Sequence, residues 1–252
     1  MIGVKGLQKA YGRSVVVDGV DLEIPAGGIT SIIGPNGAGK STLLGLVSRL
    51  LVPDAGAVTV DGLDVAVASS DEVARRLAIL RQDNHLAVRL TVRDLVRFGR
   101  YPWSKGRLTP ADREQVERAI GWVGLDELAD RFLDEMSGGQ RQRAFVAMVL
   151  CQDTDYVLLD EPLNNLDMRH AVSMMRRLRR AADDLGRTVV LVLHDINFAS
   201  CWSDRIVAMR DGAVVHQGTP AEIVRPDVLA EVYGMPIRVE EVDGRRIAVY
   251  FT

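Results

Sequence analysis

A glycine-rich octapeptide, Gly-Pro-Asn-Gly-Ala-Gly-Lys-Ser at residues 34–41, limits the possible folds of this chain more than any other segment. It matches the pattern G-x-x-x-x-G-K-[ST]. The apolar residues 29–33 before it predict a buried strand, and residues 40 to about 51 predict a helix that Pro53 ends. Glycines in such a loop let backbone amides turn toward phosphate oxygens, and the helix N-terminus adds positive partial charge. The octapeptide therefore predicts a phosphate-binding loop.

Polar side chains follow two further apolar segments. Residues 156–159 predict a strand covered on both faces, which ends at Asp160 and Glu161, and residues 188–193 predict a second one, which ends at His194. The amphipathic residues 168–185 between them predict a helix, so the order favours a parallel sheet whose strand ends share one edge. At that edge Asp160 could hold Mg²⁺, Glu161 could polarise a water molecule, and His194 could contact a γ-phosphate.

A second candidate anion site has no lysine of its own. Ser137-Gly138-Gly139-Gln140 begins a largely apolar segment, residues 138–151, that predicts a buried helix. Two glycines at a helix N-terminus can bind an anion through backbone amides. Alone this is a weak signal, and it gains weight from the phosphate loop, the acidic pair and the histidine.

The remaining elements are predicted from short local patterns. Strands are expected at residues 15–17, 20–24 and 58–60, and a closing hairpin at 238–251 around Asp243-Gly244. Asp61-Gly62 predicts a hairpin-type turn after residues 58–60. Hydroxyl and carboxylate pairs predict helix starts at Ser69 and Thr91, and Pro110 at a first helical position predicts another start at Thr109. The predicted inward face of the 168–185 helix consists of Ala171, Met174, Met175, Leu178, Ala182 and Leu185, with Gly186 as its terminator.

Composition excludes several classes of protein. The longest apolar run in the 252 residues, 144–151, is far shorter than the roughly 20 residues of a membrane span. The N-terminus has no apolar core, so we expect a cytosolic chain without a signal peptide. With 31 basic and 34 acidic residues, the net charge of −3 argues against a general nucleic-acid binder. The basic cluster Arg176, Arg177, Arg179 and Arg180 is accordingly predicted to be a solvated helix face.

Together these motifs resemble those of the ATP-binding cassette (ABC) ATPases, from Tyr11 to about residue 223. Residues 34–41 resemble the Walker A motif, 136–140 the signature (with Met136 where Leu is usual), 156–160 Walker B and 165–167 the D-loop. The resemblance implies that ATP is bound by Tyr11, Val16, Gly34, Pro35, Asn36, Gly37, Ala38, Gly39, Lys40, Ser41 and Thr42. It implies catalytic roles for Gln82, Glu161 and His194, and magnesium ligands at Ser41, Gln82 and Asp160. It also implies a D-loop residue at Asp167 and a signature that acts on the ATP of another copy, at Ser137, Gly138, Gly139 and Gln140.

The resemblance also implies a fold and partners. The expected fold is α/β: a P-loop NTPase of the ABC type, with a RecA-like parallel-sheet core and an N-terminal antiparallel β subdomain. One domain, 1–252, would contain a helical subdomain at about 83–152 and a C-terminal hairpin at about 236–252. ATP and Mg²⁺ would be the cofactors. The partners would be a second cassette, two membrane permease subunits and, indirectly, an extracytoplasmic solute-binding protein, with no nucleic acid. The expected location is the cytoplasmic face of the inner membrane.

A narrower resemblance concerns the cargo. Residues 80–85, 98–107, 162–168 and 195–199 are similar to the ATPase subunits of ferric-siderophore importers. Haem or cobalamin import stays open as an alternative, because the cassette does not normally touch the cargo. A soluble, non-transport ABC ATPase is a second alternative, but only 55 residues separate Gln82 from Ser137, too few for a coiled-coil insertion. A binding-only regulator is disfavoured because Glu161 and His194 are both present.

Three aromatic residues near Gln82 form a candidate contact for the permease. Phe98, Tyr101 and Trp103 fall within six residues, which is dense for a chain with 5% aromatic residues. We expect them to anchor a short helix of the permease, with Arg100 or Lys105 at the rim. Packing inside the helical subdomain is the alternative explanation.

Overall fold

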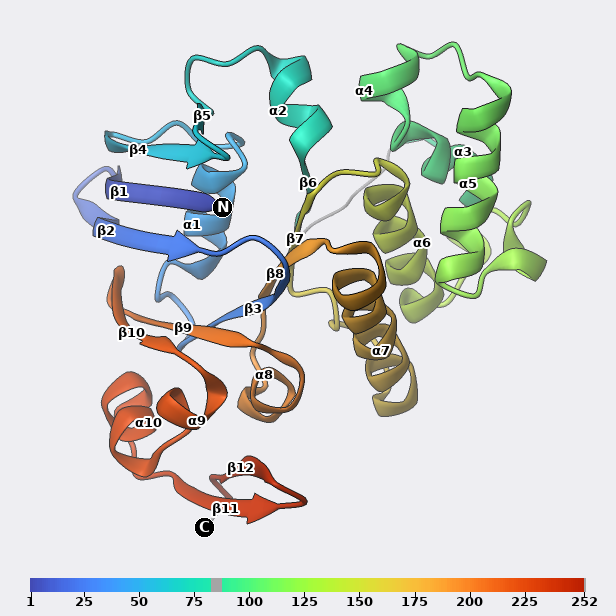
Figure 1. Ribbon diagram of the computed structural model, residues 1–252. Coiled ribbons are helices and arrows are strands. Elements are labelled where there is room, and N and C mark those ends of the chain that lie inside the picture. The colour runs from blue at the N-terminus through green and yellow to red at the C-terminus, as the bar shows by residue number, and fades with distance from the viewer. Residues whose placement is uncertain (83–87, 252) are drawn as a thin grey trace. The chain divides into compact units, whose positions relative to one another are not determined.

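The computed structural model describes residues 1–82 and 88–251, which form two compact units. The first unit contains Met1–Ala68 and Thr188–Thr252, and the second contains Ser69–Arg187. Each combines strands with helices, as Figure 1 shows, and the predicted α/β class is confirmed. None of the helices in the described residues has the length and hydropathy needed to cross a bilayer.

An antiparallel sheet opens the first unit, in the strand order β2-β1-β4-β5. Its strands are β1 (Ile2–Tyr11), β2 (Ser14–Ile24), β4 (Ala55–Val60) and β5 (Leu63–Asp64). The two strands predicted at 15–17 and 20–24 are one strand, which corrects that prediction. The register between β2 and β1 shifts at Asp18 and Gly19, and Gly19 has a positive φ of 57°. The strand is therefore irregular at the predicted gap but does not end there. The predicted turn at Asp61-Gly62 joins β4 to β5.

The phosphate loop leaves a second sheet of the first unit. Here β10 (Ala213–Gly218), β9 (Arg205–Arg210), β3 (Gly28–Ile33) and β8 (Thr188–Val192) lie side by side, and β3 runs parallel to both neighbours. Strand β3 is buried from Ile29 to its end. Helix α1 (Lys40–Val47) ends earlier than the predicted residue 51, because the carbonyl of Gly45 accepts the amides of Leu50 and Leu51 and the chain turns back.

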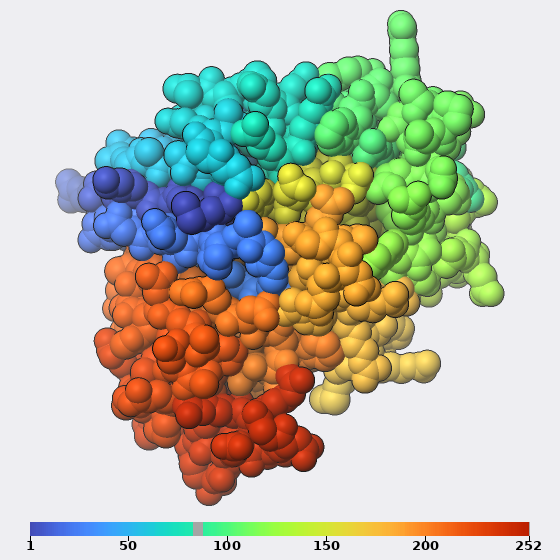
Figure 2. All heavy atoms as spheres, in the orientation of Figure 1, coloured from blue at the N-terminus to red at the C-terminus, as the bar shows by residue number. Residues whose placement is uncertain are grey.

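The first unit closes with α8 (Ile196–Trp202), α9 (Pro220–Ile223), α10 (Pro226–Tyr233) and a hairpin of β11 (Arg238–Val242) and β12 (Arg245–Val249). The hairpin confirms the predicted turn at Asp243-Gly244, both with positive φ. Two hydrogen bonds between the side-chain amide of Asn197 and the backbone of Ala248 tie β12 to α8. Most of β11 is exposed, and the hairpin lies on the molecular surface (Figure 2).

The second unit surrounds a short pair of parallel strands, β6 (Leu77–Leu80) and β7 (Tyr156–Asp160). Its helices are α2 (Ser70–Arg76), α3 (Val92–Phe98), α4 (Tyr101–Ser104), α5 (Pro110–Trp122), α6 (Gly138–Cys151) and α7 (Met168–Leu185). The capping boxes predicted at Ser69 and Thr91 are present, and the helix start predicted at Thr109 is confirmed, with a capping box that was not predicted. Helices α3, α5 and α6 pack against one another (Figure 1). Strand β6 was not expected from the sequence.

Helix α7 corrects two predictions. Its buried face ends with Ala181 and Ala182, whereas Leu185 is 52% exposed instead of inward. Leu185 is the last helical residue before Gly186, and it borders a pocket rather than the core. Within the basic cluster, Arg177 is not solvated: its guanidinium donates to the carbonyl of Trp122 at the end of α5. Arg177 therefore joins two helices.

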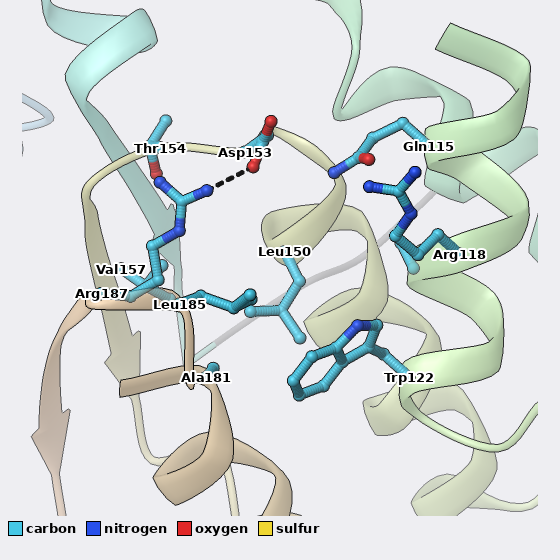
Figure 3. A pocket seen from close by; sticks show the side chains of 11 residues that line it. Gln115, Arg118, Trp122, Leu150, Asp153, Thr154, Val157, Ala181, Leu185 and Arg187 are labelled. Atoms are coloured by element: carbon cyan, nitrogen blue, oxygen red, sulfur yellow. Dashed lines mark hydrogen bonds and ion pairs between the residues drawn. The ribbon is translucent and has the colours of Figure 1, made fainter. Parts of the chain in front are cut away.

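A pocket of about 290 Å³ lies within the second unit, away from the predicted site residues (Figure 3). Leu150, Val157 and Ala181 contribute its apolar lining, and Trp122 borders it from α5. The figure shows the ion pair between Arg187 and Asp153 at its margin. Val157 lies near the start of β7, whereas Asp160 is its last residue and Glu161 follows it.

A buried ion pair joins α5 to the segment between α3 and α4. Arg100 and Asp112 side chains are only 12% and 7% exposed, and Arg100 Nε donates to Asp112 Oδ1 at 2.9 Å. Asp112 also accepts the amide and hydroxyl of Thr109 in the capping box. Arg100 is therefore an internal structural residue, which corrects its predicted place at the rim of a permease contact.

Replacing Asp112 with Ala should lower the free energy of unfolding by about 2–4 kcal/mol, because it leaves a buried guanidinium without its carboxylate and removes a cap. Urea unfolding at neutral pH measures this loss. Glu114→Ala is the control, since it removes an exposed partner of Arg118 and should cost less than about 0.5 kcal/mol. Equal losses in both variants would contradict the assignment.

The Asp112 carboxylate should also make the free energy of unfolding depend on pH in the acid range. The Thr109 amide, then the Thr109 hydroxyl and Arg100, lower the pKa of Asp112. Since the folded pKa lies below the unfolded value of about 4, the stabilisation is complete above that value and disappears as the pH falls through the lowered pKa.

Candidate functional site

The phosphate loop holds its own lysine in the structure. Lys40 is 5% exposed, and its Nζ donates to the carbonyl oxygens of Gly34 at 2.8 Å and Pro35 at 2.9 Å. Helix α1 begins at Lys40 and has no side-chain cap, so backbone amides of its first turn face the loop without a competing side chain. Asn36 and Gly37 are exposed. The loop is open to solvent above a buried ammonium group.

Two glycines of this loop are required by close approach and backbone angle. A Cβ on Gly34 would lie 2.1 Å from the carbonyl oxygen of Met209, and one on Gly39 would lie 2.3 Å from that of Val16. Both glycines also have positive φ. Any side chain at these positions would displace β9 or β2, so the loop depends on glycine there.

Other predicted residues of the first unit lie around the loop. Strands β3 and β8 are parallel and in register up to Ile32 and Val192, so the loop and His194 leave the same sheet edge. His194 is exposed there. Val16, from β2, touches the end of the loop through its carbonyl, and Tyr11 ends β1 with a 50% exposed ring. Ser41 and Thr42 belong to α1 and are partly buried.

The second unit brings Gln82 and Glu161 together. Strands β6 and β7 pair in parallel up to Leu80 and Leu159, so the residues that follow them share an edge. Gln82 Nε2 donates to Glu161 Oε2 at 2.8 Å. Asp160 and Glu161 are buried, at 6% and 7% exposure. Both carboxylates are therefore largely shielded from bulk water. A general base must lie within hydrogen-bond reach of the proton that it takes.

Sequence reasoning missed a second partner of Glu161. Asn164 Nδ2 donates to the same Oε2 atom that Gln82 contacts. Glu161 has a φ of 52°, a conformation that is uncommon for residues other than glycine. The backbone amide of Asn164 closes a turn on the Glu161 carbonyl at 3.2 Å. The spacing Glu-Pro-x-Asn, typical of a turn, was the only available signal.

The signature residues form the start of α6. Ser137 is the N-cap: its hydroxyl accepts the amide of Gln140 at 3.2 Å, while Gln140 Oε1 accepts the amide of Ser137 at 3.0 Å. Gly138 and Gly139 stand between these bonded residues. A Cβ on Gly139 would lie 3.2 Å from the carbonyl oxygen of Asn165 and from the side chain of Leu166. Gly138 and Gly139 therefore pack against Asn165 and Leu166, in the segment 165–167.

Asp167 caps helix α7. Its carboxylate accepts the amide of His170 at 2.8 Å and lies at the same distance from the His170 ring. The amide of His170 is the main cause of the lowered pKa of Asp167. Asp167 is therefore ionised at neutral pH and fixes the end of this loop.

The predicted site residues divide between the two units. The phosphate loop, Tyr11, Val16 and His194 belong to the first, and Gln82, the signature, Asp160, Glu161 and Asp167 belong to the second. Of the segment 80–85 that is similar to siderophore importers, Asp83, Asn84 and His85 lie outside the described residues, as do the first residues of the predicted 83–152 subdomain and Thr252 of the predicted hairpin.

The donor atoms present suit a phosphate–magnesium ligand. In residues 1–82 and 88–251, no group of three or more His, Cys, Asp or Glu side chains could hold a metal ion. Mg²⁺ is commonly held by one or two protein oxygens together with substrate phosphates and water. The Ser41 hydroxyl and the Asp160 carboxylate are hard oxygen donors of that kind. The loop next to Ser41 keeps its conformation because Gly34 and Gly39 have no Cβ atoms to collide with β9 and β2.

Comparison with known proteins gives a consistent result. A family described as "ABC transporter" matches residues 17–164. The petrobactin import ATP-binding protein YclP of Bacillus subtilis is 49% identical over 252 residues, covering 100% of both chains. FatE of Bacillus anthracis, also named for petrobactin import, is 51% identical over 99% of this chain and 100% of its own. The ferric enterobactin transport ATP-binding protein FepC of Escherichia coli is 42% identical over 91% of this chain and 85% of its own.

Solved structures agree with the fold. The ATP-binding cassette MJ0796, solved as a dimer in a post-hydrolysis state bound to ADP and Pi, superposes with a TM-score of 0.79 at 28% identity, covering 87% of this chain and 99% of that one. A putative metal-chelate type ABC transporter in an inward-facing conformation has a TM-score of 0.83 over 99% of this chain and 98% of its own. At 22% identity, this second likeness concerns the fold alone.

Proposed function

The chain belongs to the ABC transporter family as an ATP-hydrolysing subunit, and from this premise we propose that it powers import of a ferric siderophore through a membrane permease. The observation that carries the cargo is the 49% identity with a petrobactin import protein over the full length of both chains. Import of haem or cobalamin is the alternative, because the nucleotide-binding residues of a cassette do not contact the cargo. A chain that forms no complex with any permease would be a non-transport ATPase.

The phosphate loop would bind ATP by exchanging partners. Lys40 now donates to the carbonyls of Gly34 and Pro35. Phosphate oxygens are stronger acceptors for an ammonium group than carbonyls are, so bound ATP would replace these two contacts. The backbone amides at the start of α1 would add charge complementarity. Tyr11 offers an exposed ring for stacking on adenine, and Val16 an apolar contact beside it.

Glu161 would act as the general base. Its buried carboxylate can accept a proton from the water that attacks the γ-phosphate, and the exposed His194 would contact that phosphate. Ser41, Gln82 and Asp160 would hold Mg²⁺, which neutralises charge on the phosphates when bound. These roles are supported by residue chemistry and by the Gln82–Glu161 hydrogen bond.

The assembly would contain two copies of this chain and two permease subunits on the cytoplasmic face of the membrane. ABC cassettes form dimers, as MJ0796 does. In the proposed dimer, Ser137–Gln140 and Asp167 of one copy would act on ATP held by the other. An extracytoplasmic solute-binding protein would deliver the cargo to the permease without touching this chain.

Reconstituted uptake tests the proposed function. The chain is assembled with its permease pair and binding protein in proteoliposomes that contain Mg²⁺-ATP. Uptake of ⁵⁵Fe-petrobactin that needs ATP supports the proposal. ATP-dependent uptake of haem or cobalamin, but not of the iron chelate, would overturn the cargo, and absence of any complex with a permease would overturn the transport role.

The exposed aromatic residues supply a prediction about the permease contact. Phe98, Tyr101 and Trp103 are 55%, 58% and 40% exposed, which disfavours full packing in the core. Trp103 is partly structural, because its Nε1 donates to the Gln152 carbonyl at 2.7 Å. The Tyr101 ring makes a cation–π contact with Lys105 at 5.7 Å and, within residues 1–82 and 88–251, no side-chain hydrogen bond like that of Trp103, so Tyr101 is the better residue to replace.

Tyr101→Ala should weaken permease binding by about 1–3 kcal/mol while ATP binding and thermal stability of the isolated chain stay unchanged. Co-purification with the permease and iron uptake measure the effect. Phe251→Ala, which removes an 83% exposed ring in the other unit, is the control. A drop in thermal stability with normal permease binding would identify Tyr101 as a packing residue.

A further inference from the structure

The loop between β7 and α7 holds Glu161 in an unusual backbone conformation. Its φ of 52° is strained for a residue with a Cβ, at a cost of about 1–2 kcal/mol. The backbone amide of Asn164 bonds the Glu161 carbonyl at 3.2 Å and closes the turn. The amide of Leu166 similarly bonds the Leu163 carbonyl at 3.2 Å. The turn therefore fixes the backbone of Glu161 but not the direction of its carboxylate.

The side chain of Asn164 makes a separate contact with that carboxylate. Its Nδ2 donates to Glu161 Oε2. An ionised carboxylate only accepts hydrogen bonds, so the amide must present its nitrogen to it. Glu161 is 7% exposed whereas Asn164 is an exposed residue, so the bond joins a buried acceptor to a donor at the surface. The side-chain bond and the backbone turn are two distinct interactions of one residue.

The second donor to Oε2 comes from far along the chain. Gln82 is 79 residues from Glu161, whereas Asn164 is three residues away in the same turn. Gln82 is also a proposed magnesium ligand, a role that would draw it from the carboxylate. Asn164 has no such second role. It is therefore the donor that can stay on Glu161 throughout the reaction.

The loop is supported from its other side by the signature helix. The backbone of Gly139 packs so closely that a Cβ there would lie 3.2 Å from the carbonyl oxygen of Asn165 and from Leu166. Asp167, bonded to the amide of His170, anchors the loop to α7. A loop held at both ends can aim the Asn164 side chain at a fixed point.

We propose that Asn164 is a positioning residue, whose side-chain amide orients the Glu161 carboxylate toward the attacking water. This inference rests on the proposed role of Glu161 as general base. A residue that only forms the turn would need no more than its backbone amide, which almost any residue supplies. The side chain and the turn can therefore be separated by mutation.

Asn164→Leu is the main variant, because it keeps the side-chain size and the backbone amide but removes the donor. Asn164 does not have a positive φ, so leucine introduces no backbone strain. We expect kcat for ATP to fall about tenfold to a hundredfold, with KM, equilibrium ATP binding and thermal stability little changed. Gln115→Glu, an amide-to-acid change on α5 of the same unit, controls for added charge and should leave turnover unchanged.

Asn164→Asp is the second variant. It keeps the size of the side chain and the backbone turn, but it replaces the N–H donor by a carboxylate oxygen that repels the Glu161 carboxylate instead of donating to it. We expect kcat to fall at least about tenfold, with KM and equilibrium ATP binding little changed, a split that a purely structural role would not produce. Gln115→Glu is the control for the added charge of this variant. Should the leucine variant fold poorly, this isosteric variant tests the proposal alone.

The outcomes separate this inference from the proposed function. A wild-type chain without Mg²⁺-dependent hydrolysis would overturn the function, and a fully active Glu161→Gln would overturn the role of Glu161. If both stand and either Asn164→Leu or Asn164→Asp has wild-type kcat, or loses stability and ATP affinity in step with turnover, Asn164 does not position the base.

Discussion

Replacing Glu161 with Gln is expected to leave ATP bound and turnover lower by at least about a hundredfold. Glutamine keeps the size of the side chain and an oxygen that can accept from Gln82 and Asn164, so the loop geometry is preserved. It cannot take a proton from water at neutral pH. ATP would then stay at the site and hold two chains together. Release of phosphate and gel filtration with ATP measure the two effects.

Two further variants sharpen this result. Lys40→Ala should weaken ATP binding itself, because the ammonium contacts phosphate in both the ground and the transition state. Glu114→Gln removes an equal charge from an exposed helix position and should have wild-type turnover. Near-normal hydrolysis by the Glu161→Gln chain in the assembled transporter would assign the base to another residue.

The parts of this site that the sequence could predict depend on local patterns. Capping boxes at Ser69 and Thr91 could be predicted because their two partners lie three residues apart, and the start at Thr109 because Pro110 follows it directly. The phosphate loop was found because its glycines, Lys40 and flanking apolar segments are contiguous. The terminator Gly186 belongs to the same class, since a single left-handed residue ends the helix.

The elements that could not be predicted depend on contacts across the chain. Strand β6 follows Arg76 of α2 directly, and its four apolar residues cannot be told from a continued helix without knowledge of β7. Leu185 keeps the helical period of its buried neighbours, but the surface that covers them ends before it. The periodicity of a helix predicts which of its faces is apolar. It does not predict how many turns of that face the neighbouring elements cover.

The polar contacts that the sequence did not predict also join residues far apart in the chain or depend on tertiary packing. Arg100 or Lys105 was expected at the rim of a permease contact because of the aromatic residues beside them. Arg100 instead forms an ion pair with Asp112 of α5, and its side chain is mostly buried. Gln82 reaches Glu161 only because β6 and β7 are parallel neighbours. Asn164 was visible as part of a turn, but its contact with the base depends on the left-handed backbone of Glu161. Geometry of this kind is set by tertiary packing.

Mixing two inactive chains is expected to restore ATP hydrolysis, if the signature acts on ATP held by the other copy. Lys40→Ala removes the phosphate contact, and Ser137→Arg blocks the nest. Each variant alone would form dimers with two defective sites. In a mixed dimer, the intact Lys40 of one chain faces the intact signature of the other, so one complete site is rebuilt. Random pairing makes about half of the dimers mixed.

The readout is the turnover of the mixture relative to the wild type, with each variant at the same total concentration. Ser137 is also a helix cap, so Ser69→Arg, which breaks the equivalent box on α2, controls for lost capping and should remain active. Suppose instead that the phosphate loop and the signature of one chain bind the same ATP. Each variant chain would then have one defective site of its own, whichever chain it paired with. The mixture would then be as inactive as its components, and the sandwich arrangement would be wrong.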